Sequence, residues 1–171
     1  NTQKGNVTPI TEVKKKRYFK LAALSVASLA IVITAAALIL INSGGKTVAK
    51  DSDLAIPLSE VSEKARFYPV EIGGTKMEVL AVKASDNTVR TAFNTCQVCF
   101  ASGRGYYVQE GNYLVCQNCG NRFSTDDVEV TRGGCNPVPI TSENKTVDGG
   151  NIIISKEFLA QAKEIFSNWK K

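Results

Sequence analysis

The sequence of 171 residues contains no histidine. This absence removes the most frequent general base, the usual nitrogen ligand of zinc and the axial ligand of His-ligated haem. No Ser/His/Asp set, P-loop or dinucleotide fingerprint occurs either. We therefore predict no catalytic residues, and expect an electron-transfer component at most rather than an acid–base enzyme.

The net charge of +5 is confined to one end of the chain. Residues 1–20 hold six basic side chains and one acidic side chain, whereas residues 46–171 hold fifteen of each kind. A nucleic-acid-binding domain carries its basic residues on the folded part, where they neutralise phosphates. Because the part that can fold has no net charge, we predict no nucleic-acid partner.

A run of uncharged residues, LAALSVASLAIVITAAALILI, occupies positions 21–41. A helix of this length spans about 31 Å, close to the roughly 30 Å hydrocarbon core of a lipid bilayer. A cleaved signal peptide is the alternative, but its apolar region is typically about 7–15 residues long. The longer run favours an uncleaved transmembrane helix, and we predict a single-pass protein of the cell membrane.

The basic cluster KKKRYFK directly precedes the run, and the uncharged NSGG follows it. The positive-inside rule then places the N-terminus in the cytoplasm. We therefore predict a basic cytoplasmic tail at 1–20, a transmembrane helix at 21–41, a linker at 42–56 and an extracytoplasmic domain at 57–171.

The extracytoplasmic domain is predicted to be α+β: a small β-rich hairpin domain with a C-terminal amphipathic helix. Runs of β-branched and aromatic residues around GGT and EGN predict two hairpins. The predicted strands are at 67–72, 76–84, 88–94, 106–109, 113–116 and 127–131. A short helix capped by Ser59 is predicted within 57–67.

The C-terminal stretch SKEFLAQAKEIFSNWKK predicts a helix with Ser155 as its N-cap. Its apolar residues fall on one face at helical spacing. They are Phe158, Leu159, Ala162, Ile165, Phe166 and Trp169. We expect this face to pack on the sheet.

Four of the five cysteines form two Cys-x-x-Cys pairs separated by sixteen residues. The pairs are Cys96 with Cys99 and Cys116 with Cys119. Two intervening residues let both sulfurs of a turn face one ion, and two such turns complete a tetrahedron. Disulfides are the alternative in an extracytoplasmic domain, although an odd number of cysteines leaves at least one unpaired. We favour a metal site.

The fifth cysteine, Cys135, lies in GGCNPVP, where two glycines and Pro137 shape a turn. We predict that Cys135 lies near the metal, where it replaces a ligand, joins a two-metal or cluster site, or remains a free thiol. Four thiolates suit zinc, a single iron, an iron–sulfur cluster or copper(I), and spacing alone does not choose among them. Gly120 follows the second pair, where the backbone requires a residue tolerant of positive φ.

Three motifs in this order resemble the FtrD-like family of membrane iron–sulfur-containing proteins: RTAFNTCQVCF, GYYVQEGNYLVCQNCGNRF and GGCNPVPI. The resemblance covers about Phe67 to Ile140, and the C-terminal IIISKEFLAQAKEIFSNWK is typical of shorter members. Longer members of the family carry several membrane helices before this domain, whereas a single membrane helix is predicted in this sequence.

The resemblance implies an iron-containing centre whose ligands are Cys96, Cys99, Cys116, Cys119 and Cys135. It also implies a role beside transition-metal uptake, as an electron acceptor or carrier for a membrane transporter or redox subunit. Two alternatives remain open: a zinc-stapled interaction subunit of a membrane complex, and a protein that delivers labile copper or iron.

Overall fold

The computed structural model describes residues 47–171. The predicted cytoplasmic tail, the predicted transmembrane helix at 21–41 and residues 42–46 of the predicted linker lie outside these residues. Between residues 47 and 171, no helix is long and apolar enough to cross a membrane.

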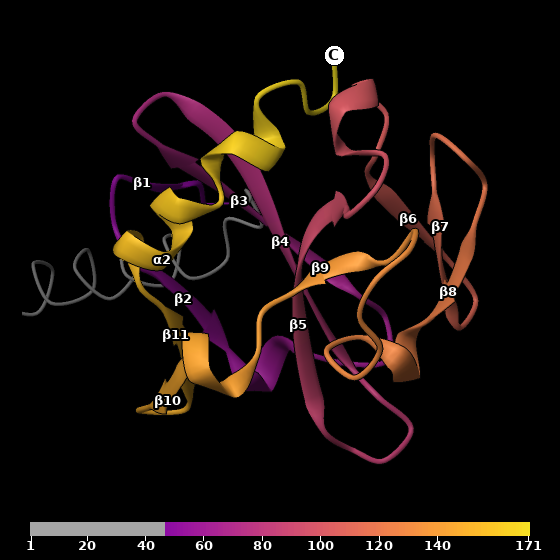
Figure 1. Ribbon diagram of the computed structural model, residues 1–171. Coiled ribbons are helices and arrows are strands. Elements are labelled where there is room, and N and C mark those ends of the chain that lie inside the picture. Colours follow the sequence, from indigo (N-terminus) through magenta and orange to yellow (C-terminus); the bar gives the residue numbers. More distant parts are fainter. Residues whose placement is uncertain (1–46) are drawn as a thin grey trace, which may run out of the picture. The chain divides into compact units, whose positions relative to one another are not determined.

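A five-stranded sheet forms the centre of the described part (Figure 1). Its strands, in spatial order, are β1 (Ala49–Lys50), β3 (Arg66–Ile72), β4 (Thr75–Lys83), β5 (Val89–Cys96) and β9 (Pro137–Pro139). The predicted hairpin of β3 and β4 is confirmed, and Gly73 and Gly74 turn it with φ of 54° and 77°. The predicted third strand is also confirmed, and it continues as far as Cys96.

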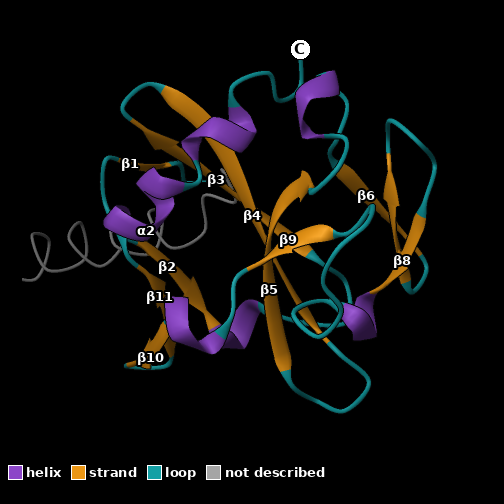
Figure 2. Ribbon diagram, viewed as in Figure 1, coloured by secondary structure: helices purple, strands orange, loops and turns teal. Residues whose placement is uncertain are grey.

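Two three-stranded sheets lie on opposite sides of this central sheet (Figure 2). One contains β10 (Thr146–Asp148), β11 (Asn151–Ile154) and β2 (Leu54–Pro57). The other contains β6 (Tyr107–Glu110), β7 (Tyr113–Cys116) and β8 (Arg122–Ser124). The second predicted hairpin is thereby confirmed as β6 and β7.

The C-terminal helix is shorter than predicted. The α-helix α2 (Lys156–Gln161) ends after six residues, and a 3-10 turn, η5 (Lys163–Phe166), follows it. Ser155 is the N-cap as predicted, because its side chain accepts the Phe158 N–H at 3.2 Å. The apolar face packs on the sheet, with Leu159 and Phe166 buried.

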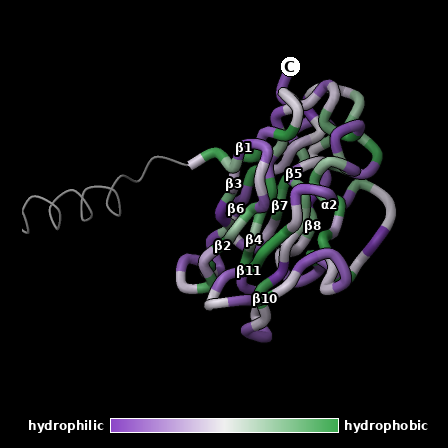
Figure 3. Tube along the Cα trace, turned by 90° about the vertical axis from the view of Figure 1, so that its left-hand side faces the viewer, coloured by the Kyte–Doolittle hydropathy of each residue, from purple (hydrophilic) through white to green (hydrophobic). Residues whose placement is uncertain are grey.

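Strands β4 and β5 are buried on both faces, and their alternating side chains enter two separate clusters. Val79, Ala81 and Phe93 belong to a main core, which α2, η5, β2 and β11 complete. Leu80, Ala92 and Cys96 point the other way into a cysteine-side core, which β6 to β8 complete. Hydrophobic residues accordingly follow the strands, and hydrophilic ones gather in the connections (Figure 3).

Three local predictions were wrong. The helix within 57–67 is a single 3-10 turn, η1 (Leu58–Glu60), because the chain must reach β3 by Arg66. The strand at 127–131 is instead the end of a 3-10 turn, η3 (Thr125–Asp127), followed by a bend in which Glu129 has a φ of 67°. The predicted linker to residue 56 contributes β1 and β2, since Leu54 and Ile56 are buried.

Two further 3-10 turns complete the described part. They are η2 (Phe100–Ser102) and η4 (Ser142–Asn144). The turn η2 follows directly after Cys99, so the first cysteine pair lies between the end of β5 and this turn.

Candidate metal centre

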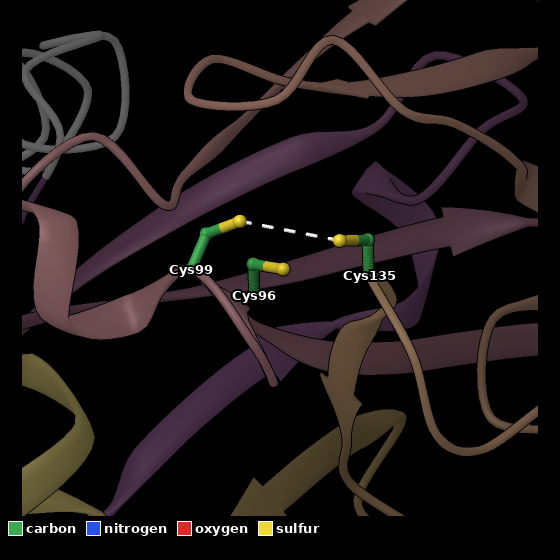
Figure 4. A group of neighbouring side chains, drawn as sticks. All are labelled: Cys96, Cys99 and Cys135. Atoms are coloured by element: carbon green, nitrogen blue, oxygen red, sulfur yellow. Dashed lines mark hydrogen bonds between the residues drawn. The ribbon is translucent and has the colours of Figure 1, made fainter.

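The structure brings the five cysteines together at one end of the cysteine-side core. All five are free thiols. The Sγ atoms of Cys96, Cys99 and Cys135 lie within 4.8 Å of one another, and so do those of Cys99, Cys116 and Cys119. Cys135 Sγ lies 3.9 Å from Cys99 Sγ and 3.5 Å from Cys119 Sγ. In Figure 4 the sulfurs of Cys99 and Cys135 point toward each other, with Cys96 beside them.

The two Cys-x-x-Cys turns are built alike. Cys96 is the last residue of β5 and Cys116 is the last residue of β7. Each first sulfur accepts hydrogen bonds from the backbone N–H groups two and three residues later: Val98 and Cys99 in one turn, Asn118 and Cys119 in the other. Such donors stabilise thiolate charge and fix the direction of a metal ligand.

Gly120 closes the second turn as predicted. Its φ is 73°, and its N–H donates to the Cys116 carbonyl oxygen at 2.9 Å. The left-handed backbone at this position suits glycine, because a side chain would clash with its own carbonyl group.

A second glycine, Gly105, supports the first turn by close approach. A Cβ atom at this position would lie 2.4 Å from the Cys99 carbonyl oxygen, so only glycine fits without a shift of the turn. The Gly105 carbonyl oxygen also accepts the Cys96 N–H at 2.6 Å. The spacing of the cysteines gave no sign of this contact.

The thiols differ in their electrostatic surroundings. The Asn121 backbone N–H lowers the pKa of the exposed Cys119 to about 7, although desolvation opposes it. Burial raises the pKa of Cys116 to about 12. At Cys96, burial works against ionisation, but the contact with Tyr107 and the backbone donors together lower the pKa.

Tyr107, which the sequence marks only as a strand residue beside the cysteines, also lies at the centre. It is fully buried, its hydroxyl donates to the Cys135 carbonyl oxygen at 2.8 Å, and it also contacts Cys96. Burial, together with the neighbouring Cys96 and the thiolate charge at Cys116, raises the pKa of Tyr107. The hairpin register could have identified it, because Tyr107 pairs directly with Cys116 and therefore shares its face.

The loop that carries Cys135 is attached to β5 by polar contacts. The Glu129 carboxylate accepts the Thr91 N–H at 2.7 Å and pairs with Lys145 at 2.5 Å. Arg90 donates to the carbonyl oxygens of Asp126 and Val128. Asn121 Nδ2 then donates to the Cys135 carbonyl oxygen at 3.0 Å, which fixes the far end of the loop to the second cysteine turn.

This donor set fits a thiophilic metal. Thiolates bind zinc, iron and copper(I) in preference to hard cations such as magnesium or calcium. The sulfurs are within the separation that a shared ion requires, and backbone N–H groups already point at them. The centre also lies at the molecular surface, since Cys119 is exposed and Cys135 is partly exposed.

Comparison with known proteins agrees with the motifs. A sequence model described as "Membrane iron-sulfur containing protein FtrD-like" matches residues 61–166, which include all five cysteines and well over half of the chain. No curated protein matches the chain, and no solved structure does.

Proposed function

Since the chain belongs to the FtrD-like family of membrane iron-sulfur containing proteins, we propose that its five cysteines hold iron as a redox centre. The single observation that carries this proposal is the convergence of five free thiols within the stretch that matches the family. Bound iron would supply a one-electron couple. The protein would then carry an electron from a reduced membrane protein to a different, oxidised acceptor.

The residues of the chain suit a carrier of this kind. Cys96 and Cys116 are buried at the ends of strands, so the ligand positions change little between oxidation states. Backbone N–H groups and the Tyr107 hydroxyl surround the sulfurs, and such hydrogen bonds tune the reduction potential of an iron–thiolate centre. Cys119 reaches the surface, where an electron can pass to or from a docked protein.

The membrane placement completes the proposal. The predicted helix at 21–41 would anchor the chain in the bilayer, with residues 57–171 on the extracytoplasmic side. Tethering raises the effective concentration of the carrier for a partner in the same membrane. We therefore assign it an accessory role beside transition-metal uptake, with a membrane transporter or redox subunit as partner.

The full chain, purified in detergent without oxygen, provides the test. Iron, acid-labile sulfide and zinc content would be measured together with the visible spectrum before and after dithionite. The proposal expects at least one iron per chain and charge-transfer bands that bleach on reduction. Substitution of Cys116 by serine should lower the iron content, whereas substitution of the exposed Ser52, in the connection between β1 and β2, by alanine should leave it unchanged.

Two other results would replace the redox function with a different one. One zinc per chain with no colour and no sulfide would remove the redox role and leave a metal-stapled interaction subunit. The exposure of Cys119 and Cys135 favours a second candidate, a protein that passes labile copper or iron to a transporter. Partial occupancy and rapid loss of the metal to a competing chelator would identify that role.

A further inference from the structure

The five sulfurs do not form a single tetrahedron in the structure. Two overlapping groups of three are Cys96 with Cys99 and Cys135, and Cys99 with Cys116 and Cys119. The sulfurs of Cys99, Cys119 and Cys135 lie within 4.8 Å of one another as well. Cys99 belongs to both groups, so its sulfur lies between the two cysteine turns and the Cys135 loop. The two groups also touch directly, through the 3.5 Å contact of Cys119 and Cys135.

A single four-coordinate ion leaves one of these thiols without a role. With metal–sulfur bonds of about 2.3 Å, the four sulfurs of a tetrahedral site are about 3.8 Å apart on every edge. Such a site has no place for a fifth ligand. Yet the Cys135 sulfur lies 3.9 Å and 3.5 Å from those of Cys99 and Cys119, the separation of sulfurs that share an ion. Contacts from Tyr107 and Asn121 to the Cys135 carbonyl oxygen hold it there.

From this arrangement we infer that the centre holds two metal ions bridged by the Cys99 thiolate. Cys96 and Cys135 complete the protein ligands of one ion, and Cys116 and Cys119 complete those of the other. The inference deepens the proposed function, because it takes the same cysteine cluster as the metal site and specifies its nuclearity and its bridging residue.

Charge balance supports two ions rather than one. The hydrogen bonds to these sulfurs come from backbone N–H groups, the Asn118 side chain and the other thiols, and Tyr107 contacts Cys96. These donors are all uncharged. Five thiolates around one divalent ion carry a charge of −3, whereas two divalent ions reduce it to −1. In a partly buried site the smaller excess charge costs much less free energy.

The bridged arrangement has a chemical consequence. Three protein sulfurs around each ion leave one coordination position on each ion for an outside ligand. Metal sites with three protein ligands and an open position are those that bind substrates or exchangeable groups. Because Cys119 and Cys135 are the exposed members of the cluster, both ions have a ligand at the surface.

Cadmium-113 provides a probe, because it binds thiolates and its nucleus reports both ligand type and neighbouring cadmium. The full chain, in detergent and without oxygen, would be loaded with ¹¹³Cd²⁺ and studied by metal analysis and NMR. The inference expects two cadmium ions per chain and two resonances split by cadmium–cadmium coupling through Cys99.

Two cysteine variants form a matched pair. Cys135→Ser should lose one ion and the coupling, and should keep one resonance at nearly its original shift. Cys99→Ser should disturb both ions, so that neither original resonance survives. Amide hydrogen exchange of β11 and α2 in the main core would confirm that each variant is folded.

The outcomes separate this inference from the proposed function. One cadmium per chain, unaffected by Cys135→Ser, would overturn the two-ion centre while iron binding stood. Two irons with two acid-labile sulfides in the protein as isolated would also overturn it, because sulfide rather than Cys99 would bridge the ions. Two coupled cadmium resonances in a chain that never acquires iron would uphold the bridge and overturn the iron redox function.

Discussion

The two sides of the central sheet are packed in different ways. The main core has fourteen buried residues, all aliphatic, aromatic or methionine, and Phe93 packs against Phe158 and Phe166 at ring-centroid distances of 5.7 Å. The cysteine-side core has eleven buried residues, and three of them are the thiols Cys96, Cys99 and Cys116.

The difference shows how each side is stabilised. Burial of large apolar side chains stabilises the main core by itself. The cysteine-side core is smaller, and its thiols lie where the ends of β5 and β7 meet. We therefore expect the main core to remain folded without metal, and the cysteine-side core to depend on it.

Metal removal should have the largest effect. A structural metal in a small thiolate site contributes on the order of 10 kcal/mol to folding, so its loss should open the side that it holds together. We expect amide hydrogen exchange of β6 to β8 to accelerate by about three orders of magnitude or more after chelation. Exchange of β11 and α2 should change little. Equal acceleration on both sides would show that the two cores are one cooperative unit.

Truncation of the main core should have the next largest effect. Phe93→Ala removes a buried ring that contacts two others, and such substitutions cost about 3–5 kcal/mol. Chemical denaturation should show this loss with and without metal. If the cost vanished in the metal-free chain, the main core would itself require the metal.

A smaller effect is expected at Gly105. The added methyl group of Gly105→Ala would meet the Cys99 carbonyl oxygen, and overpacking of this kind costs about 1–3 kcal/mol. The variant should also bind metal more weakly, because the first cysteine turn must shift.

Gly74→Ala is the control for this substitution. It lies in the β3–β4 turn with nothing within 4 Å, and its positive φ should cost about 1–2 kcal/mol. Metal affinity should be unchanged. Equal metal affinity of the Gly105 and Gly74 variants would remove the role assigned to Gly105.

The smallest effect is expected on lowering the pH, where the two regions should respond at different pH values. Protons compete with metal for thiolates, so the cysteine-side core should loosen first as the pH falls below neutrality. The β4–β5 turn should persist further, because hydrogen bonds from Thr88 lower the pKa of Asp86 to about 2.

The lowered pKa of Asp86 determines how its contribution to stability changes with pH. The folded-state pKa of Asp86 is below its ordinary value of about 3.9, so its stabilisation is complete above that value and is lost as the pH falls through about 2. Amide chemical shifts followed from pH 7 downward would show two separate transitions. A single shared transition would show that the β4–β5 turn and the cysteine-side core open together.

The hairpins and the cysteine pairs were predictable because their signals are local. Gly73 and Gly74 mark a turn between alternating strands, and Cys-x-x-Cys is a motif of only four consecutive residues. The family resemblance extended the predicted ligand set to Cys135, which the structure places beside the other thiols. The hairpins and the cysteine pairs can therefore be recognised from patterns within a few residues of the sequence.

The features that the sequence did not predict depend on contacts between segments that are distant along the chain. Strand β2 pairs with β11, nearly a hundred residues later, and no local pattern marks Leu54 to Pro57 as a strand rather than a linker. Glu129 lies in a run that alternates like a strand, yet its carboxylate is drawn to Thr91 and Lys145. The position of Cys99 in both sulfur groups likewise results from the folding of three separate loops onto one another.

The alternation of side chains along β5 also sets a rule for engineering. Phe93 enters one core and Cys96 the other, so the number of residues between them decides which side each side chain reaches. Insertion or deletion of one residue in this strand before Phe93 would exchange the two faces, placing a thiol among aromatic rings and a ring among the remaining thiols. Designers who transplant this centre into another scaffold should therefore move β5 as an intact unit and vary length only in the connections.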